Sequence, residues 1–316
     1  MCPVALRSSR SVPVSRVRAA RKAAIPPYIE PCDPTLREHA PKGDDWHFEL
    51  KADGYRAQLH LRPDGVKVYS KTGFDWTSQF SSIAAVAPHL NADSLIIDGE
   101  AVVYGKTGLP DFQQLRCELG HGKSRHVRYH AFDLLYLDGY DLRQVPYLER
   151  KRLLQRLLKD APETFVYVED IQADADAVFE HACKFGVEGV VAKRADTPYR
   201  SGRQESWIKL KCKKSETYPI IAFVEKLGAK PRKIASLYVG RREGGKLVYA
   251  GKVRTGYTEA TARELREKLD RLIRKTSPLS IPVKKPKATW VEPEVNAEIE
   301  YGRRTTARSC VQGHPR

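Results

Sequence analysis

The sequence predicts an α+β protein of two domains, a larger one of antiparallel sheets and helices and a smaller all-β one with one helix. The chain has 316 residues, enough for about two domains, and 41% of them are hydrophobic, so a sizeable core is possible. Up to residue 212, strand-like and helix-like runs alternate; from residue 215 on, short strand-like runs are separated by glycine-containing turns. We therefore place the domain boundary near residue 214.

The first domain is expected to cover residues 26–214, after a basic disordered arm over residues 1–25. Its predicted strands are rich in β-branched or aromatic residues and bounded by Gly, Pro or Asp. They cover residues 46–50, 56–61, 66–70, 94–104, 128–137 and 187–193. Its predicted helices cover residues 111–119, 147–159 and 174–185, and the second of these carries a leucine stripe near helical spacing.

The second domain, residues 215–316, is expected to hold strands over residues 218–224, 235–240, 246–253 and 290–301. One amphipathic helix is predicted over residues 258–275, with Thr258 as its N-cap and Glu259 in its first turn. A Pro- and Lys-rich connector follows at 279–287. Short strands with one inserted helix are typical of a small barrel such as the OB-fold, which often binds nucleic acid.

The charge of the chain points to a polyanionic partner. There are 55 Lys and Arg residues against 39 Asp and Glu residues, a formal net charge of +16, and nucleic acid is the first candidate. The arm up to residue 24 has no acidic residue; a transit peptide shares this composition and stays open as an alternative. No run of about 18 apolar residues predicts a membrane span.

The six cysteines form no CxxC pair, and no histidine cluster lies near them at zinc spacing. We therefore expect neither a structural zinc site nor a disulfide framework. Cysteines in this pattern favour a reducing cytoplasm. The positions are Cys2, Cys32, Cys117, Cys183, Cys212 and Cys310.

The sharpest local motif is Glu49-Leu50-Lys51-Ala52-Asp53-Gly54-Tyr55-Arg56. It displays one lysine at a strand end, followed by a turn pair in which Asp53 is a turn-shaping residue. Lys-x-Asp-Gly alone is a weak signal. Four further motifs follow it in order and raise the specificity: Asp98-Gly99-Glu100, Phe132-Asp133, Glu188-Gly189-Val190-Val191 and Lys209-Leu210-Lys211.

Together these motifs resemble the nucleotidyltransferase motifs of the ATP-dependent DNA ligases, above all the bacterial ligases of non-homologous end joining. The runs 31–36 and 133–139 add to a resemblance that covers residues 26–301. It implies an adenylation domain, an OB-fold domain, ATP, and Mg²⁺ or Mn²⁺. It also implies sealing of 5′-phosphate/3′-hydroxyl nicks in DNA repair through lysyl-AMP and adenylated DNA.

The resemblance implies that Lys51 is the nucleophile that takes up AMP, so the amine must lose its proton before it attacks. Nearby cations such as Arg56, Lys209 and Lys211 would disfavour its charged form. Glu49 matches the adenine-side contact, and Arg56 matches the arginine near the ribose and the nick. Phe132 matches the aromatic ring that stacks on adenine.

The other matched residues lie near phosphates and metal. Glu100 matches the acidic residue on the ribose and metal side, and Glu188 matches a second metal-binding carboxylate. Lys209 and Lys211 lie two apart on a predicted strand, so both point to one face and can neutralise the α-phosphate. Arg203 matches a further arginine that contacts the nucleotide.

Two departures from the family pattern bear on activity. Lys71, in Ser70-Lys71-Thr72-Gly73, stands where the family carries arginine. Lysine keeps the positive charge that can face nucleotide or DNA, but it lacks the planar guanidinium group of arginine. The tail 301–316 lacks the Arg-x-Asp-Lys-like core that orients pyrophosphate, and the spacing of Arg303, Arg304 and Arg308 does not show that any of them substitutes for it. We therefore hypothesise slow self-adenylation, with sealing of pre-adenylated nicks retained.

The expected partner is double-stranded DNA with nicks or ends, held through its phosphates. Basic candidates for this are the N-terminal arm and residues 209–214, 230–233 and 284–287. By resemblance, we expect a separate bacterial polypeptide that acts as a monomer in the cytoplasm, at the nucleoid, with a Ku-like end-binding protein. The alternatives are an RNA ligase, a capping guanylyltransferase, or a ligase-derived nucleic-acid-binding protein; an anionic membrane is disfavoured.

Overall fold

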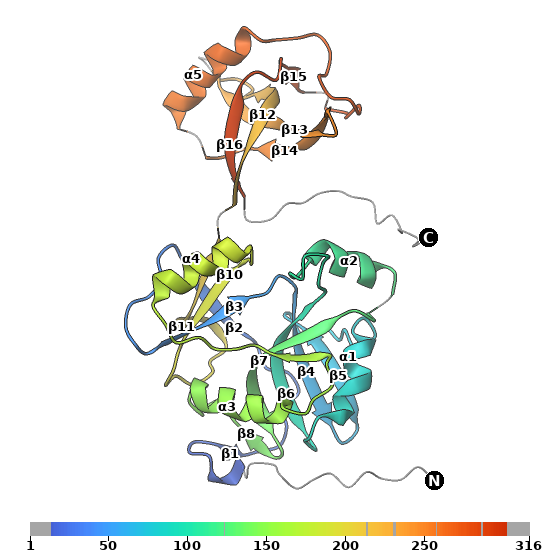
Figure 1. Ribbon diagram of the computed structural model, residues 1–316, viewed down its shortest axis with the longest axis vertical. Helices are drawn as coiled ribbons and strands as arrows, with labels where there is room; N and C mark the ends of the chain where they lie inside the picture. Colours follow the sequence, from blue (N-terminus) through green and yellow to red (C-terminus); the bar gives the residue numbers. More distant parts are fainter. Residues whose placement is uncertain are drawn as a thin grey trace. The chain divides into compact units, whose positions relative to one another are not determined.

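The computed structural model describes residues 14–122, 124–212, 214–229, 232–256, 258–285 and 287–301. The chain divides into two compact units, one up to Cys212 and one from Lys213 on. Figure 1 shows their elements, coloured along the sequence. No helix in the described part of the chain is long and apolar enough to cross a membrane.

The first unit is built on a seven-stranded sheet with the order β1-β8-β7-β6-β4-β5, in which β9 pairs with β7 (Figure 1). All neighbours are antiparallel except β7 and β9. The strands are β1 (Arg21–Lys22), β4 (Tyr55–Arg62), β5 (Gly65–Ser70), β6 (Leu95–Val102), β7 (Arg128–Leu137), β8 (Tyr140–Asp141) and β9 (Phe165–Tyr167).

Helices and turns cover this sheet and bury its main core. They are η1 (Val14–Arg16), α1 (Ser81–Val86), η2 (Ala87–His89), α2 (Phe112–Gly120) and α3 (Tyr147–Leu158). The predicted leucine stripe explains α3, because Leu154 is fully buried and Leu153, Leu157 and Leu158 are nearly so. Asp111 caps α2 by accepting hydrogen bonds from the backbone N–H groups of Gln113 and Gln114.

A second sheet of four strands has the order β2-β11-β10-β3. Its strands are β2 (Cys32–Arg37), β3 (Trp46–Lys51), β10 (Gly189–Arg194) and β11 (Gly202–Lys211), and only β2 and β11 run parallel. Helix α4 (Ala175–Phe185) begins at its N-cap Asp174, ends at Gly186 with φ 82°, and packs Val178, Phe179 and Ala182 against one face.

The other face of the four-stranded sheet packs against the seven-stranded sheet. Trp207 on β11 shares a buried cluster with Ile96 on β6 and Tyr136 on β7. The partly buried Phe132 and Val191 pack against the same cluster. The faces that the two sheets turn toward each other therefore carry residues of all five predicted motifs.

The second unit contains a five-stranded sheet, β14-β13-β12-β15, with β16 paired to the first part of β12. Its elements are β12 (Lys214–Glu225), β13 (Ile234–Glu243), β14 (Lys246–Val253), α5 (Glu259–Asp270), β15 (Thr289–Trp290) and β16 (Asn296–Tyr301). Thr258 caps α5 as predicted, accepting a hydrogen bond from the backbone N–H of Thr261. Leu269 joins α5 to a core with Ile220, Phe223 and Leu237.

Three expectations about elements are corrected. Helix α5 ends at Asp270 instead of 275, because Ile273 forms a β-bridge with Val291. The single last strand is two strands, β15 and β16, interrupted around Pro293, which cannot donate a ladder hydrogen bond. Strand β2 was not expected because Pro34 lies within it; β2 is an edge strand, where proline is tolerated.

The expected disordered arm is also wrong in part. Residues 1–13 lie outside the described residues, but Val14–Arg16 form η1 and Arg21–Lys22 form β1, which pairs with β8. Val14 is buried and Val17 packs against the same core. The basic composition of the arm favoured disorder, and the packing of Val14 and Val17 was not expected from it.

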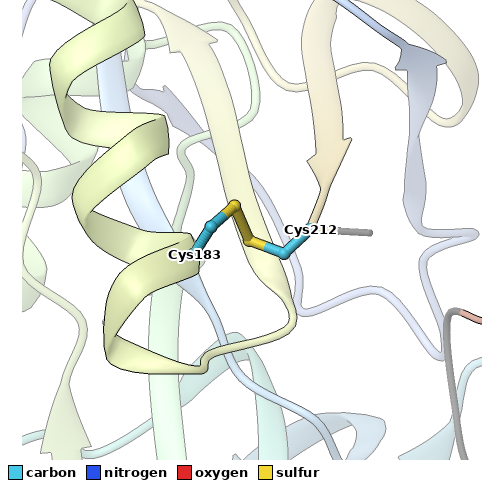
Figure 2. The surroundings of a disulfide bond; sticks show 2 residues. All are labelled: Cys183 and Cys212. Atoms are coloured by element: carbon cyan, nitrogen blue, oxygen red, sulfur yellow. A yellow bond between two sulfur atoms is a disulfide. The ribbon is translucent and has the colours of Figure 1, made fainter. Parts of the chain in front are cut away.

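A disulfide joins Cys183, near the end of α4, to Cys212, which directly follows β11 (Figure 2). The expectation of no disulfide is therefore wrong at this position. The two cysteines are 29 residues apart in the sequence, and their Cα atoms are 5.3 Å apart. The antiparallel pairing of β10 with β11 brings them together, and the spacing of cysteines along the chain carries no sign of that pairing.

Candidate active site

Lys51 lies at the end of β3, on the face of the four-stranded sheet that packs toward the other sheet. Across the sheet, Gly189 of β10 is paired with Lys51 of β3 on one side and with Lys211 of β11 on the other. Two residues further along β10, Val191 is paired with Glu49 and Lys209 in the same way. Residues directly opposite each other, and residues two apart on a strand, share a face. The expectation that Lys209 and Lys211 point to one face is confirmed, and Lys51 and Glu49 share that face.

Glu188 lies between two of these lysines. Its Oε2 is 2.6 Å from Lys51 Nζ and its Oε1 is 3.2 Å from Lys211 Nζ. Burial raises the pKa of Glu188, but Lys51 and Lys211 outweigh it and hold the pKa below its usual value. Glu188 therefore stays ionised at neutral pH between the two ammonium groups.

The residue after Glu188 must be glycine for this arrangement. Gly189 has φ 156°, and a Cβ atom built there would lie 2.0 Å from the carbonyl oxygen of Leu210. β10 can therefore approach β11 closely at this point, and the backbone N–H of Cys212 donates to the carbonyl of Glu188 at 3.0 Å. The glycine therefore lets Lys211 of β11 reach Glu188.

Arg56, on β4 of the seven-stranded sheet, is held by Asp98. Its Nε and Nη2 donate to the two carboxylate oxygens at 3.0 and 2.7 Å, and its Nη1 donates to the carbonyl of Cys32 at 2.6 Å. The Tyr199 hydroxyl donates to the same carboxylate at 2.6 Å. The guanidinium lies 5.2 Å from the centre of the Phe132 ring, so the arginine and the ring predicted to contact nucleotide are neighbours.

Glu100 is the Cα partner of Arg56 across β4 and β6. Burial, with repulsion from Glu188 and Asp98, raises the pKa of Glu100 to about 7, although Lys51 and Arg56 lower it. The two carboxylates assigned to metal therefore repel each other, and a divalent cation between them would relieve that repulsion. Among the described residues, no group of three His, Cys, Asp or Glu side chains could hold a metal by itself.

Glu49 is nearly inaccessible and lies in a network that the sequence did not reveal. Its Oε2 is 2.6 Å from Lys193 Nζ, and its Oε1 accepts from Lys151 at 3.0 Å and from the Tyr147 hydroxyl at 2.7 Å. Lys193 also lies 4.6 Å from the centre of the Phe132 ring. Because a carboxylate oxygen can accept two hydrogen bonds, Oε2 can accept one more from a ligand.

Two signals could have found the buried lysines. Lys193 lies two residues from Val191 and four from Gly189 on β10, so strand periodicity puts it on the inward face. Lys151 lies three residues before Leu154, within the apolar stripe of α3. Lysine at such positions is rare unless paired, which points to a buried acidic partner.

The remaining predicted residues lie around Asp33, which the sequence analysis did not single out. One oxygen of Asp33 is 3.2 Å from Lys71 Nζ and 3.5 Å from Lys209 Nζ. Arg203 is exposed and is the Cα partner of Asp33 across β2 and β11. Lys71 is exposed in the turn after β5. Arg303, Arg304 and Arg308 lie outside the described residues.

Known families and proteins are similar to this chain in sequence. A family model described as an ATP dependent DNA ligase domain matches residues 27–211, and one described as an ATP dependent DNA ligase C terminal region matches residues 230–312. A multifunctional non-homologous end joining protein LigD of Pseudomonas aeruginosa is 34% identical over 300 residues, 93% of this chain and 36% of its own. A LigD of Mycobacterium tuberculosis is 34% identical over 264 residues, 82% of this chain and 34% of its own.

Two solved structures are also similar. The crystal structure of the ligase domain of M. tuberculosis LigD is 32% identical, covers 87% of this chain and 90% of its own, and has a TM-score of 0.54. A mycobacterial DNA ligase D complexed with ATP and MES is 33% identical, covers 86% and 88%, and has a TM-score of 0.55. These matches confirm the predicted fold class, an adenylation domain followed by an OB-fold domain. The chain spans about a third of the length of the curated relatives.

Proposed function

This chain belongs to the family of ATP-dependent DNA ligases, and we propose that it seals 5′-phosphate/3′-hydroxyl breaks in double-stranded DNA during non-homologous end joining. The amine of Lys51 attacks the α-phosphate of ATP, which forms lysyl-AMP and releases pyrophosphate. The AMP then passes to the 5′-phosphate of DNA, and the 3′-hydroxyl displaces it. A covalent route of this kind divides one difficult displacement into easier steps.

The observation that carries the proposal is the position of Lys51 beside Lys211 and Glu188 on one face. Glu188 accepts from Lys51 at 2.6 Å, so it holds the amine in place. Lys209 and Lys211 supply positive charge on the same face for the α-phosphate as negative charge develops there. The pairing of β3, β10 and β11 already brings Lys51, Lys209 and Lys211 together, so the attack requires no rearrangement of these strands.

The base and sugar of ATP would be bound by residues of this face and of the seven-stranded sheet opposite it. Phe132 offers its ring to adenine, Glu49 accepts from the amino group of the base, and Arg56 contacts the ribose or the nick. Arg203 contacts the nucleotide, and Lys71 contacts the nucleotide or DNA. These roles come from the family resemblance, and the contacts between Arg56, Phe132 and Lys193 support them by gathering the residues in one place.

A divalent metal, Mg²⁺ or Mn²⁺, would be held by Glu100 and Glu188 and would neutralise phosphate charge when bound. The raised pKa of Glu100 fits this role, because its repulsion from Glu188 would be relieved by a cation that both carboxylates hold. The partners we infer are double-stranded DNA and a Ku-like end-binding protein. We further infer a monomer in the bacterial cytoplasm, at the nucleoid.

The test of this function is covalent labelling followed by joining. The protein is incubated with α-labelled ATP or α-labelled GTP, and then with a nicked DNA duplex or a nicked RNA duplex. We expect label from ATP only, sealing of DNA, and loss of both in Lys51→Ala. Label from GTP would indicate a guanylyltransferase, and joining of RNA alone would indicate an RNA ligase; both would contradict the proposal.

We also propose that self-adenylation is the slow step, because the tail 302–316 carries no Arg-x-Asp-Lys-like core. The first step needs that core to orient pyrophosphate, whereas sealing of a nick that already carries 5′-adenylate does not. The comparison is the rate of sealing with ATP against the rate on a 5′-adenylated nick without ATP. Equal rates would contradict slow self-adenylation and leave the ligase assignment intact.

A further inference from the structure

Asp33 lies where the chain passes from one sheet to the other. Just before it, the backbone of Ile29 exchanges two hydrogen bonds with the Gln58 side chain on β4, and the carbonyl of Cys32 accepts from Arg56. From Cys32 on, the chain runs parallel to β11 as β2, with Asp33 opposite Arg203. The carboxylate of Asp33 is therefore fixed by contacts to both sheets.

This carboxylate joins two lysines that come from different sheets. Lys71 follows β5 of the seven-stranded sheet, and Lys209 lies on β11 of the four-stranded sheet. Both ammonium groups approach the same oxygen, at 3.2 and 3.5 Å. Although burial raises the pKa of Asp33, the two lysines lower it further than burial raises it, so the group is ionised at neutral pH.

The proposed function places Lys209 at the α-phosphate and Lys71 at the nucleotide or DNA. Two ammonium groups that share one carboxylate carry a net charge of +1, and without it they would carry +2. A phosphate that approaches Lys209 or Lys71 must displace Asp33 from the lysine or lie beside its negative charge. Either outcome weakens the hold on phosphate, because like charges a few ångströms apart repel even when solvent screens them.

We propose that Asp33 is a positioning residue that acts as the resident counter-ion of Lys71 and Lys209, holding both lysines across the two sheets and competing with phosphate for them. This inference rests on the proposed function. It assigns Asp33 a role in release: a site that gives up pyrophosphate, AMP and sealed DNA in turn must not hold phosphate too firmly. The phosphate can belong to ATP or to DNA, since Lys209 and Lys71 both take part.

The test measures phosphate binding without chemistry, in the full chain carrying Lys51→Ala. In one arm, ATP and then pyrophosphate are titrated by calorimetry; in the other, a nicked duplex is titrated by fluorescence anisotropy. Three second substitutions are compared. Asp33→Asn removes the charge, Asp33→Glu keeps it, and Glu163→Gln removes one charge at a side chain that is 90% exposed and pairs only loosely with Arg128 at 3.6 Å.

We expect Asp33→Asn to tighten binding about fivefold in at least one arm, as removal of one nearby unit charge implies. Asp33→Glu and Glu163→Gln should bind like the parent. An effect in the ATP and pyrophosphate arm assigns the competition to nucleotide, and an effect in the DNA arm assigns it to the nick. Unchanged or weaker binding by Asp33→Asn in both arms would overturn the inference.

A second readout separates this role from a merely structural one. With Lys51 intact, Asp33→Asn should lower the KM for ATP or slow the release of product, and circular dichroism should show an unchanged melting temperature. A lower melting temperature with weaker phosphate binding would mean that Asp33 only supports the fold, which also overturns the inference. If the Lys51→Ala parent binds neither ATP nor nicked DNA, the proposed function fails first, and the inference falls with it.

Discussion

The first unit contains two clusters in which one glutamate lies between two lysines, and they differ chiefly in burial. In the buried cluster, Glu49 contacts Lys151 and Lys193, and the three side chains are 4%, 1% and 0% exposed. In the open cluster, Glu188 contacts Lys51 and Lys211, and the side chains are 7%, 22% and 46% exposed. Strands β3 and β10 position residues of both clusters, so one sheet and the same types of side chain form two clusters with different roles.

Burial decides what each cluster can do. Lysines that solvent cannot reach must stay paired, because an uncompensated buried charge costs several kcal/mol. Lysines that reach solvent can leave their partner, change protonation and meet a phosphate. We infer that the buried cluster fixes Glu49 and stabilises the unit, and that the open cluster carries out the reaction.

The largest expected effect separates the clusters by stability. Glu49→Ala leaves Lys151 and Lys193 without their shared carboxylate, so it should lower the free energy of unfolding by about 3–5 kcal/mol. Glu188→Ala should lower it much less, because Lys51 and Lys211 can turn to solvent. Urea unfolding followed by circular dichroism compares the two. Equal losses would show that burial does not distinguish the clusters.

The next effect separates them by activity. Lys211→Ala should slow formation of lysyl-AMP by about 10²- to 10³-fold, the typical effect of removing one group that stabilises developing charge. Its unfolding curve should match wild type, because the side chain is half-exposed. The measurement is single-turnover labelling with ATP. A rate within a factor of a few of wild type would remove Lys211 from the proposed chemistry.

The disulfide gives a third comparison, because it joins segments next to the open cluster. Cys212 directly follows Lys211, and Cys183 lies five residues before Glu188. Cross-linking a loop of this length is worth about 2–4 kcal/mol, so Cys183→Ser should destabilise the first unit by that amount. Treatment with a dithiol reductant should destabilise wild type by at least as much as the substitution does. Insensitivity of wild type to reductant would mean that the two thiols are not bonded.

The smallest expected effect concerns His60, a buried side chain outside both clusters. His60 is fully buried, and burial, with Arg62 nearby, lowers its pKa to about 3. Below about pH 6.5 the unfolded chain binds a proton on His60 that the folded chain does not, so stability falls as pH falls. The loss from pH 7 to pH 5 should be about 2 kcal/mol.

The control for this pH dependence is His60→Gln, which removes the titrating group at the same position. Its free energy of unfolding should fall less than that of wild type between pH 7 and pH 5. Parallel profiles for the two proteins would show that His60 is protonated in the folded state. That result would contradict the claim that burial lowers the pKa of His60.

The open cluster could largely be predicted from the sequence, because its residues lie in short motifs with a fixed order. Lys51, Lys209 and Lys211 follow strand periodicity, and the register of β3, β10 and β11 then sets them on one face, with Glu188 directly before β10. Most strands of the first unit were also predictable, since β-branched and aromatic runs between turn residues mark them.

The partners within the buried cluster could not be predicted, because periodicity marks Lys193 and Lys151 as inward-facing but does not show which carboxylate they meet. Lys151 and Glu49 are about 100 residues apart, and only packing of α3 against the sheets joins them. Asp33 and the pair of Cys183 and Cys212 are hidden for the same reason: their partners come from distant strands. Local patterns predict elements and strand ends, whereas contacts between sheets require the fold.

The most direct test of the account is to locate the adenylate on the protein. The full chain is incubated with ATP and a divalent metal and then digested, and the peptides are sequenced by mass spectrometry. We expect a single AMP adduct on the side chain of Lys51, with Lys151, Lys193, Lys209 and Lys211 unmodified. An adduct on one of those four lysines, with Lys51 unmodified, would contradict it.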